Sequence, residues 1–198
     1  MARIGEFSRK TKETHIDIKI NIDGTGTFEI NTGIGFFNHM LETISRHSLT
    51  DLRVDASGDI HVDYHHLVED TGILFGKGLS EILKDKAGIR RFGYAVVPLD
   101  EALVEAVIDI SGRSFCMTNL SGYSGEIGNF NFELGDVFFK GFSSMGYTLH
   151  ITVRSGSNLH HVLEAACKAF ARALRMACEI DERAEGAIPS TKEYIEKV

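Results

Sequence analysis

The stretch DYHHLVEDTG, residues Asp63 to Gly72, contains two adjacent histidines followed by a glutamate, and a shorter echo, LHHVLEAA, occupies Leu159 to Ala166. Both stretches lie in long segments whose apolar residues recur with the period of an α-helix. On such a helix the first histidine and the glutamate share one face, while the second histidine points elsewhere. The repetition of this pattern predicts an internal duplication.

The segments around the two helices support the duplication. In the first half the hydrophobic pattern predicts a hairpin of two strands, a helix, a third strand and the long helix, at 15–23, 27–31, 36–48, 51–57 and 65–85. The second half shows the same order at 94–110, 114–120, 135–146, 147–155 and 158–178. The order ββαβα therefore occurs twice, over residues of about 1–90 and 91–198.

Neither half contains enough strands to bury a sheet face and its helices alone, so we expect the halves to pack together. No linker rich in Pro, Ser or Gly separates them. The sequence therefore predicts an α+β fold in which residues 1–198 form a single domain built from two repeats.

Composition restricts the partners of the chain. The 198 residues are 43% hydrophobic and carry a formal net charge of -7, without a basic block that would attract nucleic acid or an anionic membrane. There is also no apolar run of about 18 residues and no apolar signal core at the start. We therefore expect a soluble, cytoplasmic protein with a small-molecule or protein partner.

The doubled pattern is suited to binding metal ions. His65 with Glu69, and His160 with Glu164, form converging pairs, and each helix has a spare histidine that could complete the other helix's site. The short helices would add one ligand each. The two predicted sets are His65, Glu69, His161 and Asp136, and His66, His160, Glu164 and His39. Imidazole and carboxylate donors without thiolate suit Mn, Fe or Zn.

A single copy of the pattern is more often an ordinary helix surface, but two equivalent copies favour metal. A second group of residues could bind an anion: Arg91, Arg113, Lys168 and the PSTK segment that contains Ser190, Thr191 and Lys192. Taken singly, each is more often a solvated surface charge. Only a shared pocket would make them a phosphate site.

Six stretches, in order and over nearly the whole chain, resemble the imidazoleglycerol-phosphate dehydratases of histidine biosynthesis. They are NTGIGFFNHMLETISRHS, DYHHLVEDTG, RFGYAVVPLDEAL, SGRS, LHHVLEAACKAFARAL and PSTK. The resemblance implies a duplicated fold related to ribosomal protein S5 domain 2. It also implies two manganese ions per active site and a homo-oligomer of 24 subunits with sites at subunit contacts.

Carried over by position, the resemblance implies metal ligands at His39, His65, His66, Glu69, His160, His161 and Glu164. It implies substrate contacts at Glu13, His39, His47, His65, Glu69, Arg91, Arg113, His160, Lys168, Ser190, Thr191 and Lys192, with Glu13 as the acid/base group. Asp136 stands where the family often has a histidine ligand, and His150 is the alternative.

The implied reaction removes water from imidazole glycerol phosphate to give imidazole acetol phosphate. Its difficulty is a carbon-bound proton without an adjacent carbonyl, and metal ions at the two ring nitrogens of the substrate would provide the missing electron sink. Two alternatives remain open from the residues alone. One is a metal-stabilised structural or storage assembly, and the other is a dinuclear metal hydrolase.

Overall fold

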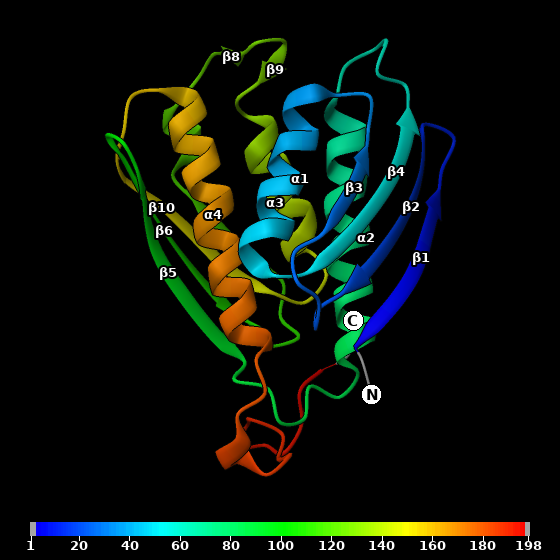
Figure 1. The fold of residues 1–198 in the computed structure, drawn as a ribbon, viewed down its shortest axis with the longest axis vertical. Coiled ribbons are helices and arrows are strands. Elements are labelled where there is room, and N and C mark those ends of the chain that lie inside the picture. The colour runs from blue at the N-terminus through cyan, green and yellow to red at the C-terminus, as the bar shows by residue number, and fades with distance from the viewer. Residues whose placement is uncertain (1–2, 197–198) are drawn as a thin grey trace.

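The computed structural model describes residues 3–196, in which two four-stranded sheets enclose four α-helices (Figure 1). The first sheet contains β1 (Ile4–Lys10), β2 (Thr14–Asn21), β4 (Asp51–Gly58) and β3 (Phe28–Asn31), in that spatial order. The second contains β5 (Phe92–Leu99), β6 (Ala102–Asp109), β10 (Thr148–Ser155) and β7 (Phe115–Thr118). In each sheet the last pair is parallel and the other pairs are antiparallel. The predicted duplication is confirmed.

The helices lie between the sheets and join the two halves (Figure 1). They are α1 (Gly35–Ser48), α2 (His65–Leu83), α3 (Leu134–Ser143) and α4 (Leu159–Cys178). Helix α2 packs on the first sheet and on α3, whereas α4 packs on the second sheet and on α1. Each half therefore buries apolar residues of the other, and one continuous core results. No helix in the described range is long and apolar enough to cross a membrane.

Glycines allow α2 and α3 to cross closely. A Cβ built on Gly72 would lie 2.5 Å from the carbonyl oxygen of Phe138, and one on Gly76 would lie 2.5 Å from that of Phe142. Gly141 of α3 faces the carbonyl oxygen of Glu69 in the same way, at 2.7 Å. Because real Cβ atoms do not approach backbone so closely, any side chain at these positions would push the two halves apart.

Each repeat differs from the predicted ββαβα by one strand. The structure adds β1 in the first repeat, and it divides the predicted segment 94–110 at a turn in which Asp100 has a φ of 47°. The remaining described elements are short: η1 (Leu120–Gly122), β8 (Glu126–Ile127), β9 (Phe130–Asn131) and η2 (Glu182–Ala184).

The prediction of a hairpin between 15–23 and 27–31 is wrong. Strand β3 pairs with β4 in parallel and does not neighbour β2. The carboxylate of Asp51 accepts the backbone N–H groups of Thr25 and Thr27 at 2.8 and 3.0 Å, and this draws the connection across the start of β4. The chain then continues on the far side of β4.

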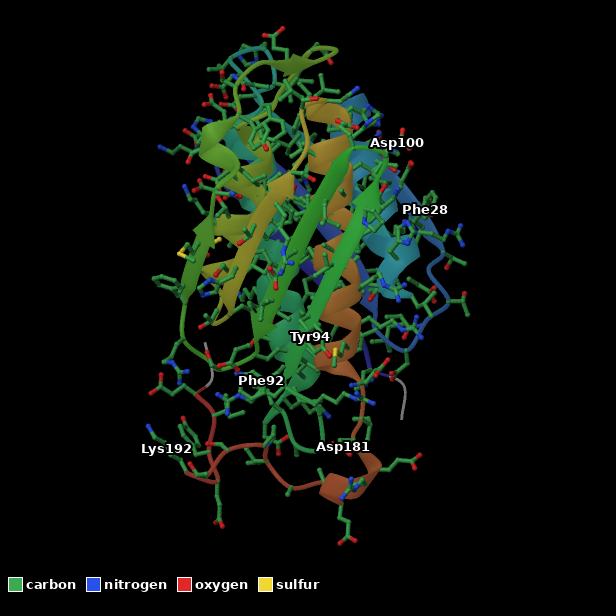
Figure 2. The ribbon with its side chains drawn as sticks, turned by 90° about the vertical axis from the view of Figure 1, so that its left-hand side faces the viewer. Phe28, Phe92, Tyr94, Asp100, Asp181 and Lys192 are labelled. Atoms are coloured by element: carbon green, nitrogen blue, oxygen red, sulfur yellow. The ribbon has the colours of Figure 1, made fainter. Side chains whose placement is uncertain are left out.

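The outer faces of the two sheets differ in chemistry. The first carries ion pairs such as Glu6–Lys19 and Glu29–Arg53. The second exposes apolar side chains, including Phe92 and Tyr94, which project from β5 (Figure 2). Val96, Val107, Phe115 and Met117 are also exposed on its strands. The duplication has therefore kept the buried faces alike while the outer faces have diverged.

Candidate active site

Helices α1, α2 and α4 all begin at the same end of the molecule (Figure 1), and this end contains the histidines of the predicted metal sites. His39 lies in the second turn of α1, and the doubled histidines lie in the first turns of α2 and α4. The start of α4 is capped by Asn158, whose side chain accepts the N–H groups of His160 and His161. The backbone beneath these two imidazoles is therefore fixed.

Three of the predicted ligands form one cluster that joins the repeats. Nε2 of His160 lies 3.0 Å from Oε2 of Glu164, and Nε2 of His39 lies 3.3 Å from the same oxygen. The imidazole centroids of His39 and His160 are 5.6 Å apart. Nε2 of His39 is buried and has no hydrogen-bond partner among the described residues. A buried nitrogen that faces a carboxylate without a well-aligned hydrogen bond suits two ligands that share one ion.

The carboxylate of this cluster is held in its charged form. Burial alone would raise the pKa of Glu164, but the hydrogen bond from Lys168, at 2.7 Å, and nearby His39 lower it to about 2. Lys168, which the family resemblance places against substrate, thus ion-pairs with Glu164. Burial, together with the charges of Lys168 and Arg172, lowers the pKa of His47. His47 therefore favours the neutral imidazole beside this cluster.

The first repeat forms a second group around His66. Nδ1 of His66 lies 2.9 Å from Oδ2 of Asp59 and 3.8 Å from Oε2 of Glu13. The hydrogen bond with Asp59 raises the pKa of His66. Glu13 and Asp59 come from the chain before β2 and after β4, two adjacent strands. The proposed acid/base residue therefore lies beside a predicted metal ligand.

His161 has a carboxylate partner from a different loop. Its Nδ1 lies 2.8 Å from Oε2 of Glu101, in the turn between β5 and β6. The hydrogen bond with His161 and the N–H of Asn158 lower the pKa of Glu101 to about 2, and Glu101 in turn raises the pKa of His161. Sequence reasoning missed Asp59 and Glu101. The duplication could have revealed Glu101, because Glu13 and Glu101 each directly precede the second strand of a repeat.

Within the described residues, the other predicted set of ligands does not form a cluster. This set is His65, Glu69, His161 and Asp136. His65 and Glu69 lie on the exposed part of α2. Asp136 forms an ion pair with Lys140 at 2.6 Å and accepts a hydrogen bond from Thr118. The alternative ligand, His150, packs its ring against Phe115, with centroids 5.7 Å apart. Within one chain, these residues lie apart from the cluster of His39, His160 and Glu164.

The predicted anion-binding residues other than Lys168, which pairs with Glu164, meet at the opposite end of the molecule. A pocket of about 700 Å³ is lined by Arg91, Arg113, Ser190, Thr191 and Lys192, among others. Arg91 is engaged, because its guanidinium donates to Asp109 and to the carbonyl oxygen of Pro189. The Arg113 side chain is 64% exposed, and its one ion pair within residues 3–196, to Asp109, is long at 3.5 Å. Lys192 is exposed as well, so Arg113 and Lys192 can both reach an anion in this pocket.

The cluster of His39, His160 and Glu164 fits a divalent metal ion. His39, His160 and Glu164 offer two imidazole nitrogens and a carboxylate oxygen within 4.8 Å of one another. Glu13, Asp59 and His66 also bring such atoms within 4.8 Å of one another, but Nδ1 of His66 is hydrogen-bonded to Asp59 there. Mixed nitrogen and oxygen donors suit Mn, Fe or Zn.

Comparison with known proteins identifies the family of the chain. The family model described as imidazoleglycerol-phosphate dehydratase matches residues 32–174. The imidazoleglycerol-phosphate dehydratase of Polaromonas sp. is 53% identical over 191 residues, which is 96% of this chain and 93% of the relative. The chain belongs to the imidazoleglycerol-phosphate dehydratase family. The resemblance and the prediction of a hydro-lyase are confirmed.

Solved imidazoleglycerol-phosphate dehydratases share the fold. The Staphylococcus aureus enzyme superposes with a TM-score of 0.81 at 38% identity, covering 90% of this chain and 99% of its own. The IGPD of Pyrococcus furiosus, solved in complex with (S)-C348, gives a TM-score of 0.82 at 34% identity, covering 96% and 100%. The family thus retains the two-sheet architecture.

Proposed function

We propose that the chain converts D-erythro-imidazole glycerol phosphate to imidazole acetol phosphate and water, a step of L-histidine biosynthesis, with two Mn²⁺ ions per active site. The cluster of His39, His160 and Glu164 is the observation that carries the proposal, because it joins metal-binding groups from both repeats. Bound ions would supply an electron sink for a substrate whose carbon-bound proton has no adjacent carbonyl.

The residues of the chain divide into three roles. Arg113, Lys192 and the hydroxyls of Ser190 and Thr191 bind the substrate phosphate in the lower pocket. The histidines and glutamates at the starts of α2 and α4 hold the ions and orient the imidazole ring. Glu13, whose side chain is 56% exposed beside His66, moves the proton because its carboxylate can reach a bound substrate.

The two parts of the site are too far apart to serve one substrate within one chain. The N–H of Arg91 donates to the carbonyl of Ala177, near the end of α4, whereas His161 lies at its start. At 1.5 Å per residue, these points on α4 are about 24 Å apart. Figure 2 places Lys192, which lines the pocket, and Asp100, in the β5–β6 turn near His161, toward opposite ends of the molecule. A small phosphate ester cannot span this length.

A complete active site therefore draws its metal end and its phosphate end from different copies of the chain. The apolar outer face of the second sheet is suited to such contacts. We propose a cytoplasmic homo-oligomer of 24 subunits. Light scattering after size-exclusion chromatography tests the subunit number, and chelation of the metals should reduce it if ions link the copies.

The reaction itself has a direct test. Purified protein with Mn²⁺ should convert imidazole glycerol phosphate to the keto product, while metal-stripped protein should not. Tight metal binding and assembly without turnover would instead indicate a structural or storage protein. Release of inorganic phosphate in place of the keto product would indicate a hydrolase.

A further inference from the structure

The duplication places two glutamates at equivalent positions with different surroundings. Glu13 directly precedes β2, and Glu101 directly precedes β6, the matching strand of the second repeat. Each faces the second histidine of its own repeat's long helix. Glu101 contacts Nδ1 of His161 at 2.8 Å, but Glu13 stays 3.8 Å from Nδ1 of His66. In the first repeat Asp59 makes the short contact instead, at 2.9 Å.

We propose that Glu101 is a positioning residue for His161, and that Asp59 has the same role for His66. A carboxylate at Nδ1 accepts the imidazole N–H and so keeps the proton on that nitrogen. The lone pair of Nε2 then points away from that carboxylate, which is the state that binds a metal ion. In His161 this Nε2 lies 3.8 Å from Oδ2 of the exposed Asp100, a distance too long for a hydrogen bond. This inference rests on the proposed function, because it requires both histidines to be metal ligands.

The second oxygen of Glu101 fixes the orientation of its carboxylate. Oε1 accepts the backbone N–H groups of Ser157 at 3.2 Å and Asn158 at 2.8 Å, just before α4. Glu101 therefore connects the β5–β6 turn to the start of the helix that carries His161. The same position in the first repeat leaves Glu13 exposed and free for substrate chemistry. The two copies of one position have thus taken different roles.

Substitution of Glu101 by Gln separates positioning from structural support. The amide oxygen would stay on the side of Ser157 and Asn158, because two N–H donors face it and would repel an NH₂ group. The NH₂ group would then face His161 and donate to Nδ1, which moves the imidazole proton to Nε2. A protonated Nε2 cannot bind an ion.

The experiment titrates metal-free protein with Mn²⁺ and measures free Mn²⁺ by electron paramagnetic resonance. We expect E101Q to weaken one class of site about 10- to 100-fold, while the thermal unfolding midpoint of the metal-free protein stays close to that of the native chain. E105Q is the matched control. It makes the same chemical change on β6, where the side chain of Glu105 pairs with Arg154 at 2.6 Å instead of with a predicted metal ligand.

Two further variants complete the test. E101D keeps an acceptor-only carboxylate on a shorter arm, so it should bind Mn²⁺ more tightly than E101Q. In D59N the loss should be smaller than in E101Q. Oδ1 of Asp59 has no hydrogen-bond partner among the described residues, so an amide there can turn its oxygen toward His66.

Native affinity in E101Q would overturn the positioning role, as would an E101D affinity no better than that of E101Q. If E101Q fails to fold, the Mn²⁺ affinity of E101D is compared with that of the native protein and of E105Q. A loss of Mn²⁺ affinity of more than 100-fold in E101D would indicate that Glu101 acts only as a structural support. Absence of Mn²⁺ binding by the native chain would overturn the proposed metal dependence together with this inference.

Discussion

Nη1 of Arg91 lies 2.8 Å from the carbonyl oxygen of Pro189, although 98 residues separate them along the chain. The same guanidinium donates to both carboxylate oxygens of Asp109, at 2.7 and 3.2 Å. Arg91 thus anchors the C-terminal segment that contains Ser190 and Lys192. It shapes the proposed phosphate pocket, while its own donors are taken by Asp109 and Pro189.

Substitutions of Arg91 and of Arg113 should therefore have different effects on kinetics and on stability. R113A should raise KM by about 10- to 100-fold with little change in kcat, because a charge-assisted hydrogen bond contributes roughly 1.5 to 3 kcal/mol. R91A should in addition lower the free energy of unfolding by about 3 kcal/mol, since it leaves the part-buried Asp109 with only the long contact to Arg113. Steady-state kinetics and denaturant unfolding on both variants check this. Equal unfolding midpoints would contradict the anchoring role.

The glutamates of the doubled pattern should each affect one ion. Glu164 belongs to the cluster with His39 and His160, whereas Glu69 lies apart from it on α2. E69Q and E164Q should each reduce the metal content toward half, while activity collapses in both. Metal analysis beside kinetics decides the question. A fully active E69Q or E164Q protein would refute the two-ion mechanism.

Acid should destabilise the connection that Asp51 holds. Burial alone would raise the pKa of Asp51, but the N–H donors of Thr27 and Thr25 lower it to about 2 in the folded state. Because the pKa of Asp51 is lower in the folded state, its carboxylate stabilises the folded protein at pH values above the unfolded-state pKa of roughly 3.9. This stabilisation is lost as the pH falls through about 2. D51N should show a shallower loss of unfolding free energy between about pH 4 and pH 2. Identical pH profiles would contradict this role.

The close crossing of α2 and α3 should not tolerate a methyl group. G72A places a Cβ 2.5 Å from the carbonyl oxygen of Phe138 and should cost about 1 to 3 kcal/mol of stability, although alanine favours helices. G122A is the control, because a Cβ at Gly122 has no neighbouring heavy atom within 4 Å. Denaturant midpoints for both proteins provide the measurement, and equal midpoints would show that the crossing can relax.

The sequence predicted the elements that follow from the local periodicity of apolar residues. The long helices and the two repeats follow from apolar spacing, and the equivalence of the doubled histidines follows from the repeats. Strand β1 was missed because its alternation is weak: IGEFSRK contains few apolar residues and no fully buried one. The position of β3 depends on the hydrogen bonds of Asp51, which no hydrophobic pattern encodes.

The sequence predicted which residues belong to the candidate site, but it did not predict which side chains contact them. Helical spacing correctly places His160 beside Glu164. It does not show that Nδ1 of His161 contacts Glu101, 60 residues earlier, because that contact depends on how the β5–β6 turn meets α4. Asp136 looked equivalent to His39 by position, yet Lys140 one turn later supplies an ion-pair partner.

His39 comes from one repeat, whereas His160 and Glu164 come from the other. A half-length ancestor could not have assembled this cluster alone and would have needed a second identical copy. Fusion of two genes would have made that association permanent. From then on, mutations in one copy no longer appeared in the other, so a single ancestral glutamate could give rise to both Glu13 and Glu101, with different neighbours in the present protein.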